Sequence, residues 1–302
     1  MTTIIHTFTK PFNYAIENTS IYFSNSAKYF MKITLTDFIL PLNELITLLI
    51  MTVCWICLYI VVHNIPFKYY KQCSVLKNLD TKNRIVSIIH ASILCLLAIY
   101  DYLFYQSTKC GISNTKFQND LLIFSCSYFI YDILISLYFN ILEPGMLLHH
   151  VFVILSEYSG ILFNNSASEM LRAIIVGEIS NPIMHFRKIV SNFNLKDTKL
   201  FLFLEYSYFF LYILFRMTFG WYVLYWTICC MDNLFIVKLG GTIILVQSAL
   251  FTVNMYTIIK RRVKEQKERN KERVSLFWFE FNKNIASLNY YKKTSLKDSY
   301  VP

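Results

Sequence analysis

The sequence predicts an all-α polytopic membrane protein with about seven transmembrane helices. Only 16% of its 302 residues are charged, against about 25% in soluble proteins, and the mean hydropathy is +0.42. The apolar residues gather in seven runs long enough for a helix to cross a bilayer, which takes roughly 20 residues. Runs such as LITLLIMTVCWICLYIVV have no polar face at helical spacing, which excludes the amphipathic helix of a soluble domain. They are also twice as long as the strands of a membrane barrel and do not alternate, so helices are the expected spanning elements.

Seven spans follow one another along the chain, each placed by the limits of its apolar run. The fourth is short, the fifth is rich in polar residues, and the sixth is long enough to be tilted or kinked at Gly220. The predicted spans cover residues 38–62, 85–105, 121–141, 146–163, 169–190, 200–227 and 235–259.

The basic residues of the connections set the predicted orientation. With seven spans, the loops at 63–84 and 191–199 and the C-terminal tail lie on one side, and they hold most of the Lys and Arg residues. The positive-inside rule therefore puts the C-terminus in the cytosol, or its topological equivalent, and the N-terminus across the membrane. The net charge of +10 is thus mainly a topology signal. No nucleic-acid partner is expected, because glutamates interrupt the basic run at 260–273, which directly follows a span.

Residues 1–37 form a polar segment before the first span. A cleavable signal peptide is not expected, because the apolar run that follows is far longer than a signal-peptide core. The segment also lacks Arg and contains Glu17, unlike a typical mitochondrial presequence. We expect a location in the endoplasmic reticulum or another endomembrane, and import through an internal signal leaves the mitochondrial inner membrane as the alternative. Asn18 begins an N-x-S sequon on the side opposite the cytosol.

The eight cysteines give little indication of function. Cys54 and Cys57 form a CWIC sequence that mimics a redox motif, but it lies among Leu, Ile and Val in the middle of a span, where a thiolate is badly desolvated. We therefore expect these two residues to be inert packing groups. Cys110, Cys229 and Cys230 fall near the ends of spans on the far side of the membrane and are able to pair with one another, but their spacing does not decide whether they do.

The ionisable and polar residues inside the spans are the informative ones, because a charge at bilayer depth costs several kcal/mol and normally faces a cavity or a partner. With the orientation above, the arginines and histidines of this set fall in the cytosolic half of four different spans, and the acids lie just beneath them. The set comprises Arg84, His90, Tyr128, Asp132, His149, His150, Glu157, Glu178, Asn181, His185 and Arg187.

Two interpretations of this set stay open. Buried polar groups hold transmembrane helices in register by satisfying one another. Alternatively, they form a polar pocket at one end of an apolar chamber, suited to a lipid with its head toward the cytosol and its chain in the helix bundle. Four other ionisable residues are expected to be structural or interfacial: Glu44, Asp101, Glu205 and Arg216.

The order of short motifs in this region resembles the TLC domain, the family that includes the ceramide synthases and a set of lipid-homeostasis membrane proteins. The motifs are RIVSIIHA, SYFIYD, the pair His149 and His150, then EISNP followed by Arg187. The resemblance covers residues 77–265 and implies a barrel of six helices around a tunnel open toward the cytosol. The first span at 38–62 then precedes the domain, and residues 266–302 form a basic and aromatic tail whose SLFWFEF segment lies in the membrane interface.

The resemblance to the ceramide synthases also implies a chemistry. In that family a His pair and two downstream acids serve acyl transfer from acyl-CoA to a long-chain base, and the His pair carries over to His149 and His150. The acids correspond to Glu178 and Asn181, so one carboxylate is replaced by an amide, which does not ionise and therefore does not act as a base. A histidine remains able to act as nucleophile or base. This departure makes the sequence more similar to the non-synthase members.

Other chemistries find no support in the sequence. Membrane di-iron hydroxylases need about eight histidines in HxxxH and HxxHH boxes, and this chain has six histidines and neither box. No metal site is expected, because adjacent helical residues such as His149 and His150 point about 100° apart. No resident cofactor is expected either, since GxxxxGK[ST], GxGxxG and GxSxG are missing from the sequence.

Three hypotheses for function follow. The first is a membrane protein that binds or senses a phospholipid or sphingolipid and contributes to membrane lipid homeostasis. The second is an acyltransferase that takes acyl-CoA as substrate and uses His149 or His150. The third is an accessory, structural subunit of a larger membrane complex, with protein partners and a structural lipid in its pocket.

Overall fold

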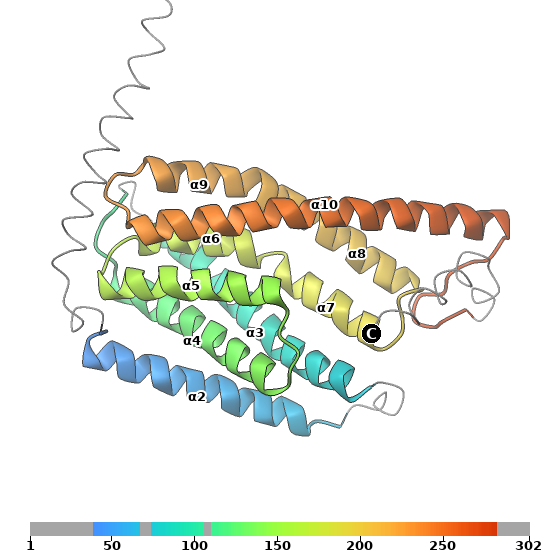
Figure 1. The fold of residues 1–302 in the computed structure, drawn as a ribbon, viewed down its shortest axis with the longest axis horizontal. Coiled ribbons are helices and arrows are strands. Elements are labelled where there is room, and N and C mark those ends of the chain that lie inside the picture. Colours follow the sequence, from blue (N-terminus) through green and yellow to red (C-terminus); the bar gives the residue numbers. More distant parts are fainter. Residues whose placement is uncertain (1–38, 67–73, 106–109, 283–302) are drawn as a thin grey trace, which may run out of the picture. The chain divides into compact units, whose positions relative to one another are not determined.

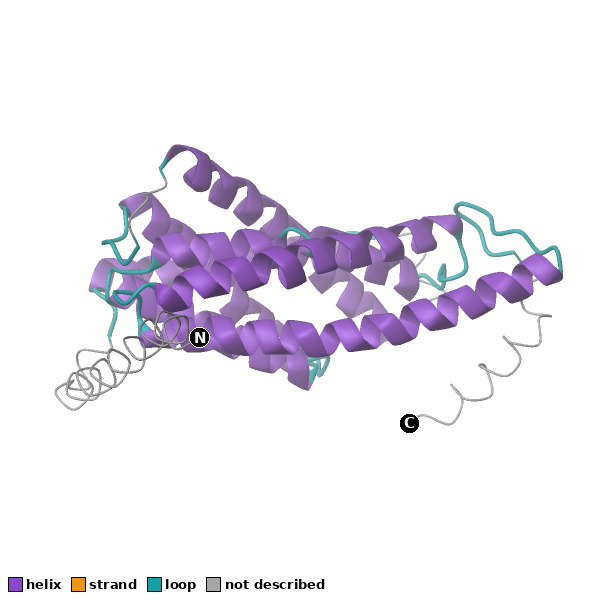
Figure 2. Cartoon of the chain, turned by 90° about the horizontal axis from the view of Figure 1, so that it is seen from above, coloured by secondary structure: helices purple, strands orange, loops and turns teal. Residues whose placement is uncertain are grey.

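The computed structural model describes residues 39–66, 74–105 and 110–282. In that part of the chain helices linked by loops make up the fold (Figures 1 and 2), and the one strand-type pairing is an isolated bridge between Ser113 and Asn165. The chain is therefore an all-α polytopic membrane protein, as the sequence predicts. The N-terminal segment at 1–37, with its sequon, and the end of the tail lie outside the described residues.

Six helices of the described part are long and apolar enough to cross a membrane. They overlap six of the seven predicted spans, although the second begins ten residues earlier and the last ends twelve residues later than predicted. They are α2 (Leu42–Asn64), α3 (Val75–Phe104), α4 (Lys116–Tyr138), α5 (Pro144–Leu162), the continuous run Lys199–Cys229, and α10 (Phe235–Lys271).

The predicted fifth span at 169–190 is not one continuous helix. It consists of α6 (Ala167–Glu178) and α7 (Asn181–Asn192), which follow one another along the bundle (Figure 1). The break falls just before Pro182, which lacks the N–H that would bond one turn back and disfavours helical backbone in the preceding residue. The pair thus makes the seventh passage, with an interruption near its middle.

The helices start at residues whose side chains or rings suit a helix N-terminus. Ser74 accepts a hydrogen bond from the Lys77 amide, and Thr115 forms a reciprocal capping box with Gln118. Pro144 occupies the first position of α5, where its missing N–H costs nothing. These groups satisfy amides that would otherwise be left unpaired at the ends of the spans.

Six passages form a ring, and α2 lies outside it. Contacts between elements run from α3 to α4, α5, α10, α9, α6 and back to α3. In the sixth passage α8 (Lys199–Tyr212) leads through a π-helix, η3 (Ile213–Phe219), into α9 (Gly220–Cys229). On α2, Trp55 and Tyr59 are buried against α3 and α4, and the Trp55 indole donates to Ser127 Oγ at 3.2 Å.

The final helix continues well beyond the predicted last span. α10 has 37 residues and is therefore about 55 Å long, so residues 260–271 extend past the apolar stretch and include the first part of the predicted tail. The chain then returns to the start of α8, where the Lys199 amide donates to Phe277 O at 2.8 Å.

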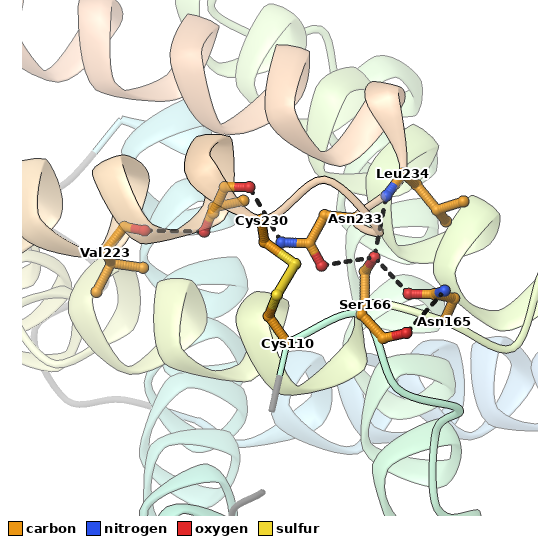
Figure 3. The surroundings of a disulfide bond; sticks show 9 residues. Cys110, Asn165, Ser166, Val223, Cys230, Asn233 and Leu234 are labelled. Carbon is orange, nitrogen blue, oxygen red and sulfur yellow. Dashed lines mark hydrogen bonds between the residues drawn. A yellow bond between two sulfur atoms is a disulfide. The ribbon is translucent and has the colours of Figure 1, made fainter. Parts of the chain in front are cut away.

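Loops at the opposite end of the bundle are tied together by a disulfide and a polar network (Figure 3). Cys110 pairs with Cys230, which decides among the three cysteines that the sequence leaves open, and Cys229 is free and exposed. The Leu234 amide donates to Ser166 Oγ at 3.1 Å, and Asn233 Nδ2 donates to Thr227 O at 3.0 Å. These bonds fix the end of α9 against the loop that precedes α6.

Candidate functional site

A largely apolar chamber lies inside the ring. Counting its open mouth and the solvent space there, it holds about 930 Å³ free of atoms. Its walls come from α5, α6, η3, α9 and α10, with one residue of α4. The apolar lining includes Phe129, Val153, Met170, Ile174, Val223, Leu224, Ile244 and Leu245.

One end of the chamber is polar and lies near the middle of the bundle. Glu178 and His149 line it, and the Glu178 carboxylate accepts a hydrogen bond from Asn181 Nδ2 at 2.8 Å. Arg216 also lines it, donating to the Gly177 carbonyl and, at 3.1 Å, to Asn181 Oδ1. Asn181 therefore links the carboxylate to the guanidinium and fixes both at the junction of α6 and α7.

Two more buried carboxyl groups line the chamber farther toward the disulfide. Glu157 of α5 accepts from Ser125 Oγ at 2.7 Å, and Glu169 lies in the first turn of α6. Among the described residues, one Glu157 oxygen is buried without a hydrogen bond, and the buried Glu169 carboxyl has no side-chain hydrogen-bond partner. The chamber thus carries three carboxyl groups against one guanidinium, all in an environment where unpaired charge is costly.

A separate polar network joins α3, α4 and α5 beside the chamber. Asp132 accepts from Asn83 Nδ2 at 2.6 Å, and its other oxygen lies 3.5 Å from His150 Nδ1. The Tyr131 hydroxyl donates to Asn83 Oδ1 at 2.7 Å. Buried hydrogen bonds of this kind hold membrane helices together, so these contacts tie α3, α4 and α5 to one another.

His90 and Tyr128 extend this network toward α2. The two rings stack at a centroid distance of 3.6 Å, and the Tyr128 hydroxyl donates to Ser87 Oγ at 2.8 Å. The Trp55 ring meets His90 edge-on at 5.7 Å. His90 is therefore packed among rings and does not line the chamber.

Arg84 and His185 meet between α3 and α7. The Arg84 guanidinium pairs with Asp80 at 2.9 Å and lies 3.2 Å from His185 Nδ1. Asn192 also donates to Asp80, at 2.7 Å. This cluster fixes α7 to the start of α3.

Arg187 contacts a different group of residues from the rest of the predicted set. It pairs with Glu205 at 2.8 Å, and the other Glu205 oxygen accepts from Arg262 Nε at 2.7 Å. Arg262 also donates to Glu265 at 2.7 Å, and Arg187 lies over the Tyr208 ring at 5.4 Å. The cluster joins α7, α8 and α10 and has no residue on the chamber wall.

The structure thus divides the residues that the sequence groups into one pocket. His149, Glu157 and Glu178 line the chamber, and Asn181 donates a hydrogen bond to the Glu178 carboxylate. The other candidates lie between helices as described above: Arg84, His90, Tyr128, Asp132, His150, His185 and Arg187.

Two residues that line the chamber are missing from the predicted site. Arg216 is expected from the sequence to be structural, and Glu169 stands at the start of the predicted fifth span. The sequence feature that indicates both residues is an ionisable side chain within an apolar run. Within the described ranges, no group of three His, Cys, Asp or Glu residues is arranged to hold a metal ion.

The ring of passages, the motif order and the chamber together agree with a comparison to known families. A family model described as the TLC domain matches residues 80–260, more than half of the chain. The match begins in α3 and ends in α10, so it covers all the elements that form the ring and leaves α2 outside. The chain therefore belongs to the TLC-domain family of multi-pass membrane proteins.

Proposed function

We propose that this protein binds a membrane lipid in the chamber and contributes to membrane lipid homeostasis. The observation that carries the proposal is an apolar cavity inside a membrane bundle with a few polar groups at fixed positions. Apolar walls favour an acyl chain, because they are matched to hydrocarbon and to little else. The polar groups supply partners for the ester, amide or headgroup of the same molecule.

Occupation by lipid also satisfies groups that the protein leaves without partners. Among the described residues, Glu169 has no side-chain hydrogen-bond partner, and one Glu157 oxygen has no hydrogen bond. A buried polar group without a partner costs roughly 1–3 kcal/mol, so a ligand with donors gains affinity from these positions. A bare hydrocarbon has no donors and gains no affinity from these positions.

The orientation and compartment form part of the proposal. The end with the Cys110–Cys230 disulfide lies opposite the basic loops and the end of α10. Disulfides persist in oxidising compartments, and basic loops face the cytosol. Both features favour a secretory membrane such as the endoplasmic reticulum, with the disulfide end in the lumen and the C-terminal tail in the cytosol.

Filling the chamber tests lipid binding. Ile244 lines the chamber, whereas Val246, two residues along α10, is 53% exposed on the outer face. The full chain is purified in detergent, and the lipids it retains are extracted and counted by mass spectrometry. We expect Ile244→Trp to retain at least about tenfold less lipid than the unmodified protein, and the control Val246→Trp to retain the same amount. Equal retention in all three proteins would contradict the proposal.

Acyl transfer is a second candidate, favoured by the place of His149 on the chamber wall beside Glu178 and Arg216. In such a reaction the thioester C–S bond of acyl-CoA breaks, the acyl carbon bonds to an amine, and the amine proton leaves with the thiol. The same preparation incubated with labelled acyl-CoA and a long-chain base tests this. A product that disappears in His149→Ala supports it, and no product from the unmodified protein argues against it.

A further inference from the structure

A second hollow adjoins the chamber at the disulfide end. It holds about 680 Å³ of space free of atoms, counted with its open mouth, and is lined by Arg172 of α6, Trp226 of α9 and the Cys110–Cys230 pair. Glu169, Val223 and Thr227 line both hollows. The two spaces therefore meet between α6 and α9, at the first turn of one helix and the last turns of the other.

This second hollow lies at the depth where lipid headgroups are found. The exposed face of α9 carries three large amphipathic rings, with Tyr222 62%, Tyr225 62% and Trp226 53% exposed. Tyr and Trp gather at the boundary between hydrocarbon and water. The hollow thus opens at the membrane interface, and the chamber continues inward from it for about 14 Å along α6, from Glu169 to Glu178.

Charged groups of both signs border the second hollow. Glu169 is 3% exposed, lines both spaces, and has no side-chain hydrogen-bond partner among the described residues. Arg172 lies one turn along α6 and lines the same hollow. The wall of the hollow therefore carries one carboxyl group and one guanidinium, a group of each sign for a ligand that itself carries both charges.

We propose that the second hollow is a headgroup site for a zwitterionic phospholipid. The phosphate binds Arg172, the headgroup ammonium binds Glu169, and one acyl chain passes Val223 and Thr227 into the chamber. A purely anionic headgroup would place its charge against Glu169 without a compensating cation of its own. A cationic amphiphile has no anionic group to bind the Arg172 guanidinium. The inference rests on the proposed function and names the class of lipid and the side from which it enters.

Competition among lipids tests the headgroup site. The full chain is reconstituted in nanodiscs with equal amounts of phosphatidylethanolamine, phosphatidylglycerol and diacylglycerol, released, and analysed for retained lipid by native mass spectrometry. We expect the unmodified protein to enrich phosphatidylethanolamine. Glu169→Gln should lower the ratio of phosphatidylethanolamine to phosphatidylglycerol about tenfold, the size expected for one charge-assisted hydrogen bond. Arg172→Gln should lower both phospholipids relative to diacylglycerol.

Two further variants control for folding and for charge in general. Glu169→Asp keeps the carboxylate and should keep the preference for phosphatidylethanolamine. Lys116 and Asp120 form an exposed ion pair of 3.0 Å at the start of α4, at the same end of the bundle, and the double variant Lys116→Gln, Asp120→Asn should not change any ratio.

The two proposals fail in different ways. If Glu169→Gln and Arg172→Gln leave all ratios unchanged while Ile244→Trp still empties the chamber, the headgroup site is wrong and lipid binding stands. A protein that shows no preference between the two phospholipids also overturns the headgroup site. If Ile244→Trp retains as much lipid as the unmodified protein, lipid binding in the chamber fails as well.

Discussion

At the scale of single residues, the sequence predicts which side chains are buried but not which neighbours they find. Arg187 illustrates the difference. The sequence predicts its depth along the span, but not that it pairs with Glu205 of α8 and stays off the chamber wall. Depth follows from the count of residues along a span at 1.5 Å each. The face that a residue presents depends on the rotation of the helix about its axis, which packing sets.

Glu205 is the residue whose loss should cost the most stability in the arginine cluster. Its two oxygens pair with Arg187 and Arg262, and it is 1% exposed. Removing one partner of a buried ion pair leaves uncompensated charge and costs about 3–5 kcal/mol. We expect Glu205→Gln to lower the free energy of unfolding by that amount in a detergent denaturation assay. The exposed Glu143, replaced in the same way, should leave it unchanged, and an unchanged value for Glu205→Gln would mean that the cluster contributes little.

At the scale of elements, apolar runs predict helices well and their interruptions poorly. Six of the spans lie close to their predicted positions, because length and hydropathy suffice to define a helix in a bilayer. The break between α6 and α7 has a visible cause in Pro182. The π-helix in the sixth passage has no such cause in its local sequence. It ends next to Gly220, the position at which the sequence allows a tilt or kink. Its wide turns depend on packing partners that the local sequence does not specify.

Gly240 and Gly177 differ in how closely the neighbouring helix approaches them. A Cβ at Gly240 would lie 2.2 Å from Ser156 Oγ of α5, whereas one at Gly177 meets nothing within 4 Å. Because the Ser156 hydroxyl is able to rotate away, we expect Gly240→Ala to break its hydrogen bond to the Phe152 carbonyl and to cost about 1 kcal/mol. Gly177→Ala should instead stabilise its helix by about 1 kcal/mol. Thermal unfolding of both variants in one detergent checks the contrast, and equal shifts would argue against close packing at Gly240.

At the scale of the whole molecule, the sequence predicts the family and the composition of the bundle but not the division of its polar interior. The motifs identify the TLC domain, and the match over residues 80–260 confirms it. The predicted single pocket becomes a chamber flanked by networks that bind helices to one another. The chamber and the networks between helices use the same residue types, because a buried imidazole or carboxylate needs a hydrogen-bond partner wherever it lies. Only the arrangement of the helices separates Glu178, on the wall, from Asp132, behind it.

The disulfide links positions 120 residues apart and so closes a loop of more than a third of the 302-residue chain. Cross-links over loops of this size typically contribute about 2–4 kcal/mol, mainly by restricting the unfolded chain. We expect Cys110→Ser to lower stability by that amount and Cys229→Ser to have no effect. Mobility on gels with and without reductant reports the bond itself. A Cys110→Ser protein with unaltered stability, or a Cys229→Ser protein that loses the mobility difference, would show that the pairing is not the one described.

The π-helix at Ile213–Phe219 makes the sixth passage sensitive to its own length. Each hydrogen bond there encloses one residue more than in an α-helix, and each residue turns the helix surface by about 100°. Deleting one residue from this segment would restore an ordinary α-helix and rotate all of α9 by that angle. Val223 and Thr227, which line both hollows, would then no longer face them. Many exchanges of one side chain for another leave that surface facing inward. The number of residues between Tyr212 and Gly220, more than their identity, is what this crossing has to keep.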